Sequence, residues 1–332
     1  MSIQYDGSGT PNSQSTCMIQ ATNEGYANGK SCTVTFNVAE DMDGPVYVYY
    51  ELTNFYQNHR KYVKSLSFKQ LRGEATDHHD LADCAPLDQV VVGGATKTLN
   101  PCGLVANSLF NDVFNLTSSQ RPSFTDSGIA WSSDVDSKFG QPEGFSAAEC
   151  LCGGSSASTT PPGCSSASMC GSSGSPGAYG CGSSGTAHLD VSTSTCYAYT
   201  YPDDDNTQYL YESYPMVVQP QEGVLNEHFI VWMRTAGLPT FRKLYGIINT
   251  DLKAGDAVTF EVSPNFNVAS FAGTKSLVLS TVSWFGGKNP FLGYSYIVVG
   301  AACVVAGGIF GVKHMVRPRK LGDTRYLVWK EA

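Results

Sequence analysis

The side chains in this sequence most able to do chemistry are those of its 11 cysteines. Ten of them lie between residues 17 and 196, and the eleventh, Cys303, lies in a long apolar run. Such a set can form disulfides in an oxidising compartment, or it can bind zinc in the cytosol. The compartment in which the chain resides therefore decides which chemistry these thiols perform.

The apolar run indicates the compartment. Residues 291–312 read FLGYSYIVVGAACVVAGGIFGV and carry no charged side chain, and about 20 helical residues are needed to cross a bilayer. Because basic residues beside a spanning helix stay in the cytosol, we expect a cytosolic tail at 313–332 and a lumenal or extracellular ectodomain at 1–290. The basic residues after the run are Lys313, His314, Arg317, Arg319 and Lys320.

The ectodomain cysteines are even in number, which is typical of a disulfide framework. No two of them have the C-x-x-C spacing, and the expected topology argues against a cytosolic zinc site. Cys303 lies inside the expected span, away from the others. The ten candidates for disulfides are Cys17, Cys32, Cys84, Cys102, Cys150, Cys152, Cys164, Cys170, Cys181 and Cys196.

Motifs of other site chemistries are missing from the sequence. It contains no G-x-x-x-x-G-K-[ST], no H-E-x-x-H and no G-x-S-x-G. The group DHHD at 77–80 is interpreted as a hydrated loop, because neighbouring ligands on one loop do not fix the geometry around a metal. We therefore expect no catalytic residue, no metal and no cofactor, and a function in binding or structure.

The composition narrows the class of protein. The 332 residues carry a formal net charge of -8, and the pI is about 5.2, which argues against a nucleic-acid partner. Only 15% of residues are charged, whereas Gly, Tyr and Phe are plentiful. This balance favours an ectodomain rich in strands and loops over a helical bundle.

The expected elements are mostly strands. Alternation of apolar and polar residues predicts strands at 32–38 and 257–262, and further strands are expected at 45–50 and 277–284. Apolar residues at helical spacing predict an amphipathic helix over 52–63 and a second short helix over 104–114. Regular patterning also marks 229–234 and 241–245. The fold class is thus mainly β with short helices, an antiparallel ectodomain followed by one spanning helix.

Residues 150–196 differ from the rest. Gly, Ser, Ala and six cysteines dominate them, so they cannot bury enough apolar surface to offset the entropy of the chain. We interpret this segment as a surface insertion loop whose order comes from disulfides. The acidic residues 203–205 that follow it are expected to form a solvated turn.

Two motifs concern modification and packing in the membrane. Asn115 begins the sequon Asn115-Leu116-Thr117, which would carry an N-glycan in a lumenal domain. Within the span, Gly307 and Gly311 form a G-x-x-x-G, and Gly300 precedes them by one heptad. This face either receives a partner helix or reflects the general abundance of Gly in membrane helices.

The N-terminal sequence MSIQYDGSGTPN has no basic n-region and no apolar h-region, so it is not a signal peptide. Either the final helix alone directs insertion, or the natural start of the chain is missing. We favour the second explanation.

Several long stretches are similar to one known family. They resemble the β-subunits of lipid flippases, the family named after a cell-division-cycle protein and a ligand-effect modulator. The matching stretches are 49–73 (YYELTNFYQNHRKYVKSLSFKQLRG), 101–114 (PCGLVANSLFNDVF), 226–245 (NEHFIVWMRTAGLPTFRKLY), 280–293 (STVSWFGGKNPFLG) and 318–329 (PRKLGDTRYLVW).

The resemblance implies a non-catalytic subunit. Such proteins pair one-to-one with a type IV P-type ATPase, which moves phospholipids to the cytosolic leaflet. They support its folding, its exit from the endoplasmic reticulum and its transport cycle. The implied location is the membrane of the endoplasmic reticulum, the Golgi or endosomes, or the plasma membrane.

The resemblance also implies details of the fold. The family has an antiparallel β-sandwich between two membrane helices, and Cys17 with Cys32 and Cys84 with Cys102 occupy the places of its disulfides. A frequent family glycosylation position falls at Asn111, where this chain has no sequon. The first family helix is missing here, and the insertion 150–196 is not part of the family pattern.

The competing hypothesis is a single-pass, disulfide-rich receptor or adhesion protein.

Overall fold

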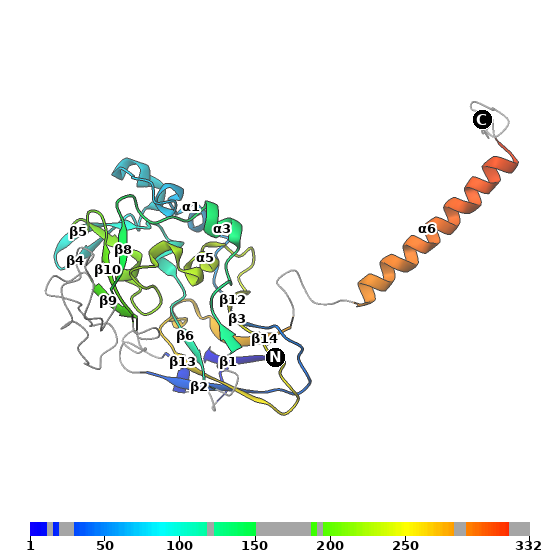
Figure 1. Cartoon of the computed structure of the whole chain (residues 1–332), viewed down its shortest axis with the longest axis horizontal. Coiled ribbons are helices and arrows are strands. Elements are labelled where there is room, and N and C mark those ends of the chain that lie inside the picture. Colours follow the sequence, from blue (N-terminus) through cyan, green and yellow to red (C-terminus); the bar gives the residue numbers. More distant parts are fainter. Residues whose placement is uncertain are drawn as a thin grey trace. The chain divides into compact units, whose positions relative to one another are not determined.

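The computed structural model describes seven stretches of the chain, which form two compact units, 1–281 and 282–332 (Figure 1). Each unit is described by itself below. The described residues are 1–11, 16–19, 30–117, 123–150, 187–190, 195–281 and 290–318.

The first unit is built on a five-stranded antiparallel sheet, in which the first and last strands of the unit are neighbours. Its strands β14, β3 and β12 lie side by side in Figure 1, and Leu277 pairs with Tyr50 in their register. In order across the sheet, the strands are β1 (Ser2–Gly7), β14 (Thr274–Ser280), β3 (Val46–Leu52), β12 (Phe241–Ile248) and β7 (Phe124–Thr125).

A second antiparallel sheet packs on the first. It has the order β2 (Cys32–Asn37), β13 (Ala257–Ser263) and β6 (Val113–Leu116). Phe114 of β6 makes edge-to-face contacts with Tyr5 and Tyr245, both from the five-stranded sheet, at centroid distances of 5.8 and 4.7 Å. The two sheets therefore share one core, and the predicted antiparallel sandwich with few short helices is confirmed.

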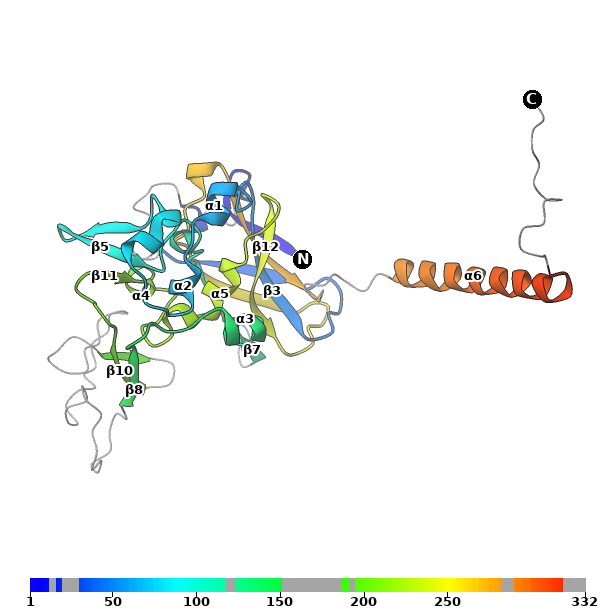
Figure 2. The same ribbon diagram turned by 90° about the horizontal axis from the view of Figure 1, so that it is seen from above.

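A smaller lobe lies beside the sandwich (Figure 2). It contains a three-stranded sheet with the order β11 (Thr207–Tyr209), β5 (Ala95–Asn100) and β4 (Gln89–Val92), in which β11 runs parallel to β5. A separate small core of Leu81, Cys84, Leu99 and Cys102 holds it together. Residues 203–205 precede β11 in an exposed turn, as expected.

The short helices differ from the predicted ones. The predicted helix over 52–63 exists only as α1 (Arg60–Lys64), because Leu52 closes β3 and Asn54 has a positive φ of 59°. The predicted helix over 104–114 is wrong as well, since only a 3-10 turn at Ala106–Ser108 forms before β6 begins. The other helices are α2 (Phe68–Leu71), α3 (Ser132–Ser137), α4 (Leu210–Ser213) and α5 (Glu227–Met233).

The ends of the insertion are ordered into strands. β8 (Ser146–Cys150), β10 (Thr195–Thr200) and β9 (Ala187–Asp190) form a three-stranded antiparallel sheet. The prediction of a loop over all of 150–196 is therefore wrong at its C-terminal end, where the backbone of β10 pairs with both neighbours. Residues 151–186 and 191–194 lie outside the described residues.

The second unit contains one long helix, α6 (Pro290–Val316). Within the described residues it is the one helix long and apolar enough to cross a membrane, with a candidate span at Phe291–Val316. The helix thus extends four residues beyond the predicted span of 291–312, through Lys313 and His314.

Candidate functional site

Three of the glycines of α6 lie on one face of the helix. Gly307 and Gly311 are four residues apart, and Gly300 lies seven residues before Gly307, so all three share a face at helical periodicity. A Cβ added at any of them would meet no atom within 4 Å. Glycine at these positions would allow another helix to approach closely. Cys303 is a free, exposed cysteine on the same helix.

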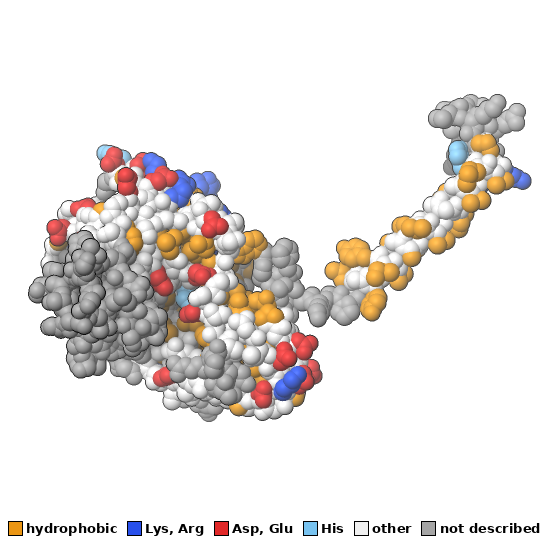
Figure 3. All heavy atoms as spheres, in the orientation of Figure 1, with side chains coloured by type: hydrophobic (Ala, Val, Ile, Leu, Met, Phe, Trp, Pro, Cys, Tyr) orange, Lys and Arg blue, Asp and Glu red, His pale blue; other side chains and the backbone are white. Residues whose placement is uncertain are grey.

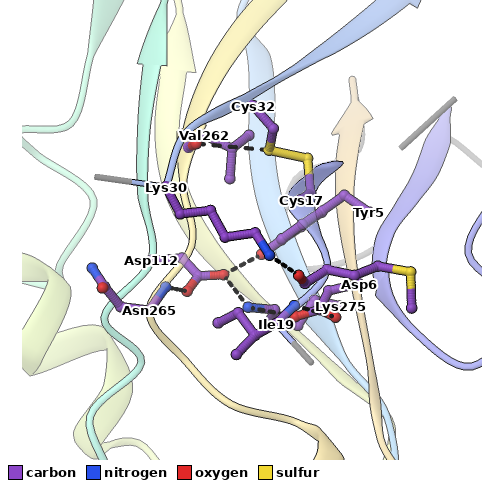
Figure 4. The surroundings of a disulfide bond; sticks show 11 residues. Tyr5, Asp6, Cys17, Ile19, Lys30, Cys32, Asp112, Val262, Asn265 and Lys275 are labelled. Atoms are coloured by element: carbon purple, nitrogen blue, oxygen red, sulfur yellow. Dashed lines mark hydrogen bonds and ion pairs between the residues drawn. A yellow bond between two sulfur atoms is a disulfide. The ribbon is translucent and has the colours of Figure 1, made fainter. Parts of the chain in front are cut away.

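The strand that leads toward α6 is fixed by a buried ion cluster. Lys275 of β14 is fully buried, and its Nζ lies 2.7 Å from Asp112 Oδ2 and 3.1 Å from Asp6 Oδ2. It also donates a hydrogen bond to the carbonyl oxygen of Phe266 at 2.6 Å. Figure 4 shows the three charged side chains converging beneath the disulfide between Cys17 and Cys32.

Asp112, the carboxylate nearer to Lys275, has further donors. Asp112 Oδ1 accepts from the backbone N–H groups of Asn265 and Phe266, both at 2.6 Å, and Asp112 Oδ2 accepts from the hydroxyl of Tyr5 at 2.8 Å. Burial and the charge of Asp112 raise the pKa of Tyr5. A buried ion pair is tolerated when its remaining hydrogen-bonding capacity is satisfied in this way. The cluster therefore holds β1, β14 and the segment before β6 in one arrangement.

Two disulfides lie in the described part of the first unit, and they are the pairs that the family resemblance implies. Cys17 bonds to Cys32 beside the ion cluster, and Cys84 bonds to Cys102 in the core of the small lobe. Gly103, which follows Cys102, has a φ of 98°, and a Cβ there would lie 2.1 Å from the carbonyl oxygen of Ser65. The backbone after Cys102 thus packs directly on the segment between α1 and α2.

The cysteines of the insertion are only partly placed. The register of β8 and β10 sets Cys196 opposite Cys150, and the pairing of the insertion cysteines stays a prediction. Cys152, Cys164, Cys170 and Cys181 lie outside the described residues.

A buried lysine closes the C-terminal end of α5. Lys243 of β12 is 6% exposed, and its Nζ donates to the carbonyl oxygens of Val231 and Trp232 at 3.0 Å each and to that of Arg234. Burial, with a smaller contribution from the charge of Arg234, lowers the pKa of Lys243 to about 7. Carbonyls that end a helix need donors from elsewhere, and this side chain supplies them.

An exposed turn follows α5. The guanidinium of Arg234 lies over the ring of Trp131 at 4.3 Å and pairs with the buried carboxylate of Asp134. Beyond it, Leu238 is 70% exposed. The indole N–H of the buried Trp232 donates to the carbonyl oxygen of Val105 at 2.8 Å. The stretch 226–245 therefore combines a buried, hydrogen-bonded helix with an exposed turn.

The sequon asparagine lies at the surface. Asn115 is exposed on β6 opposite Glu261, between the buried side chains of Phe114 and Leu116. Thr117 Oγ1 donates to the carbonyl of Thr259 at 3.0 Å. A glycan on Asn115 would therefore project away from the core.

The histidines at 78–79 lie in a 3-10 turn, His78–Cys84. Among the described stretches, no group of three or more His, Cys, Asp or Glu side chains is arranged to hold a metal ion.

Sequence reasoning missed the buried lysines. The two-residue alternation of the strands could have indicated both. Lys275 has the same alternation as the inward-facing Leu277 and Leu279 of β14, and Lys243 has that of the inward-facing Phe241 and Tyr245 of β12. A charged residue in phase with the core residues of a strand indicates a buried charge.

Comparison with known proteins identifies related sequences over almost the whole chain. The model of the LEM3 (ligand-effect modulator 3) family / CDC50 family matches residues 1–320. Putative ALA-interacting subunit 4 of Arabidopsis thaliana is 39% identical over 307 residues, which cover 91% of this chain and 72% of that protein.

Relatives also occur in animals and fungi. Cell cycle control protein 50B of Homo sapiens is 35% identical over 327 residues, covering 94% of this chain and 79% of the human protein. The phospholipid-transporting ATPase accessory subunit CDC50 of Chaetomium thermophilum is 31% identical over 320 residues, covering 92% of this chain and 65% of the fungal protein.

Proposed function

The chain belongs to the LEM3/CDC50 family, and we propose on this basis that it is the non-catalytic accessory subunit of a phospholipid-transporting P-type ATPase. The family match over residues 1–320 carries the proposal, together with relatives named as an accessory subunit of such an ATPase and as an ALA-interacting subunit. The competing hypothesis of a receptor or adhesion protein gains nothing from these relatives.

The finer points belong to the same proposal. The subunit pairs one-to-one with a type IV ATPase and supports its folding, its exit from the endoplasmic reticulum and its transport cycle. The ectodomain faces the lumen or the cell exterior, in the Golgi, endosomes, endoplasmic reticulum or plasma membrane. The basic residues after α6 and the disulfides of the ectodomain support this orientation.

The glycine face of α6 is the proposed membrane contact. Gly300, Gly307 and Gly311 place three residues without side chains on one face of α6, and packing of small residues drives helix association in a bilayer. The ion cluster around Lys275 fixes β14, so that the strand before the linker to α6 has a defined position in the ectodomain.

Affinity purification tests the proposal. The full-length subunit is purified from detergent-solubilised membranes, with an unrelated single-pass membrane protein carrying the same tag as the control. We expect a P-type ATPase in near-equal molar amount with the subunit and none with the control. Repeated recovery of the intact subunit without any ATPase would refute the proposed function.

A second measurement tests the non-catalytic part. The purified subunit alone, in liposomes with ATP, should move no lipid, whereas the co-purified complex should. Headgroup-selective, ATP-dependent transport by the subunit alone would contradict the accessory role.

A further inference from the structure

The basic residues of the ectodomain are concentrated in one place. Residues 1–281 contain 14 Lys and Arg against 27 Asp and Glu, so this unit is strongly acidic. Yet no acidic residue occurs from 52 to 73, and five of the 14 basic residues fall within residues 60–72. They are Arg60, Lys61, Lys64, Lys69 and Arg72.

Three of these cations have no counter-charge among the residues that the structure describes. Lys69 pairs with Asp80 at 3.0 Å and Arg72 with Glu74 at 2.6 Å, but within the described part of the chain Arg60, Lys61 and Lys64 form no ion pair. All three are exposed on α1, a helix that buries none of its residues. Figure 3 shows the basic side chains gathered where Figure 1 places α1.

Apolar side chains stand among these cations. Val63 of α1 is 40% exposed, Phe68 at the start of α2 is 63% exposed, and Tyr56 shortly before α1 is 57% exposed. Aromatic residues and Arg are enriched at protein interfaces. We call this group the α1 surface: Tyr56, Arg60, Lys61, Val63, Lys64 and Phe68.

Hydrogen bonds hold the residues around the α1 surface to the rest of the unit. The fully buried Gln57 accepts a hydrogen bond from the backbone of Ala236 at 2.8 Å, and Asn58 donates to the carbonyl of Gly237 at 3.0 Å. The hydroxyls of Tyr62 and Ser108 are 2.8 Å apart. A surface held in this way loses little conformational entropy when it binds.

We propose that the α1 surface is the docking site for an acidic, apolar-tipped segment of the ATPase partner on the lumenal or extracellular side. This proposal rests on the proposed function. Uncompensated positive charge on an otherwise acidic domain selects a negatively charged partner, whereas the acidic remainder of the domain repels other acidic ectodomains. The exposed Val63 and Phe68 supply the apolar contact that charge alone does not.

The proposed function favours a protein segment over lipid headgroups, because it places an ATPase beside this subunit. A lipid occupant is kept as an outcome of the second experiment.

The first experiment neutralises the surface. Arg60→Gln, Lys61→Gln and Lys64→Gln are combined in the full-length subunit, which is expressed with its ATPase, and recovery of the ATPase is measured at low and high salt. The matched control combines Lys97→Gln, Lys138→Gln and Lys253→Gln, which removes the same charge elsewhere. We expect about a tenfold loss for the α1 variant at low salt and little loss for the control.

Near 1 M salt, where the Debye length is about 3 Å, wild type and the α1 variant should approach one another. Equal losses for the two triple variants, or equal recovery of wild type and the α1 variant at low salt, would overturn the proposal. Absence of the ATPase from the wild-type sample would instead refute the proposed function.

The second experiment identifies the occupant. A photo-crosslinking phenylalanine analogue replaces Phe68 in one variant and Val91 in another, because Val91 is also exposed, at 68%, but lies on β4. We expect a crosslink from position 68 to an acidic extracytosolic segment of the ATPase, read by mass spectrometry, and none from position 91. A phospholipid adduct at 68, or no ATPase adduct there while the ATPase co-purifies, would overturn the docking site.

Discussion

The buried Lys243 gives the protein a stability that depends on pH in a predictable direction. Its pKa in the folded state is about 7, whereas an unfolded lysine titrates near pH 10.4. Between pH 7 and pH 9 the unfolded chain keeps this proton while the folded chain releases it. Since stability rises with pH wherever the unfolded state binds more protons, the free energy of unfolding should increase over this window by about 2 kcal/mol from this residue alone.

The substitution Lys243→Met removes the titrating amine and keeps much of its apolar volume. It leaves the carbonyls of Val231, Trp232 and Arg234 without this donor, which costs about 1–3 kcal/mol for each group left unsatisfied. That cost does not depend on pH. The gain of stability from pH 7 to pH 9 is therefore missing from the variant.

Denaturant unfolding of the detergent-solubilised protein at several pH values measures the difference. Tryptophan fluorescence is a suitable signal, because Lys243 Nζ lies 5.5 Å from the ring of Trp232. Lys253→Met is the matched control, since Lys253 has a 60% exposed side chain. A wild-type minus Lys243→Met difference that stays constant from pH 7 to pH 9 would refute the reasoning, because it would mean that the buried amine keeps its charge.

Three further predictions concern the membrane helix, the sequon and the ion cluster. Gly307→Leu should abolish recovery of the ATPase by pull-down while the ectodomain stays folded, because dispersion contacts between helices are lost over about 1 Å of added separation. Asn115→Gln should abolish an endoglycosidase-sensitive mobility shift seen for the wild type. Lys275→Met should lower the free energy of unfolding by about 3–5 kcal/mol, because it leaves Asp6 and Asp112 buried without a counter-charge.

Each of these substitutions has a matched control. Ala302→Leu adds bulk to an exposed position on the side of α6 opposite the glycine face, and it should leave ATPase recovery unchanged. Asn111→Gln changes an asparagine outside any sequon and should leave the mobility shift intact. Lys253→Met, at an exposed pair with Asp41, should not measurably alter stability. A control that behaves like its test variant contradicts the corresponding prediction.

The strands and the membrane helix could be predicted because local patterns decide them. Alternation in 32–38 and 257–262 places Val34, Phe36, Val258 and Phe260 inward, and these residues pack between the sheets. The charge-free run before Lys313 predicted a spanning helix by length alone. In both cases the buried or membrane-facing residues are neighbours in sequence, so period and length are enough.

The two helix predictions were wrong because apolar residues at helical spacing pack into the core here without forming a helix. Phe55 contacts five aromatic rings, including those of Trp232 and Phe266, at centroid distances of 5.2–6.3 Å. It is drawn into the core by partners about 180 residues away in sequence, and the backbone at Asn54 turns to allow this. Tertiary packing therefore overrides local period, as propensity arguments alone cannot foresee.

The functional features divide along the same line. The long motifs were enough to predict the family and its disulfide pairs. The contacts that residues of these motifs make with one another could be seen only in the three-dimensional structure. The stretch 226–245 is a helix, a turn and a strand whose lysine closes the helix, and its exposed tip lies against the residues that precede α1. Two of the long matching stretches thus form one surface: 226–245 supplies hydrogen-bonding partners, and 49–73 supplies the cations and apolar side chains. This arrangement favours binding to a partner protein. A surface that hydrogen bonds already keep in one conformation loses little conformational entropy when it binds.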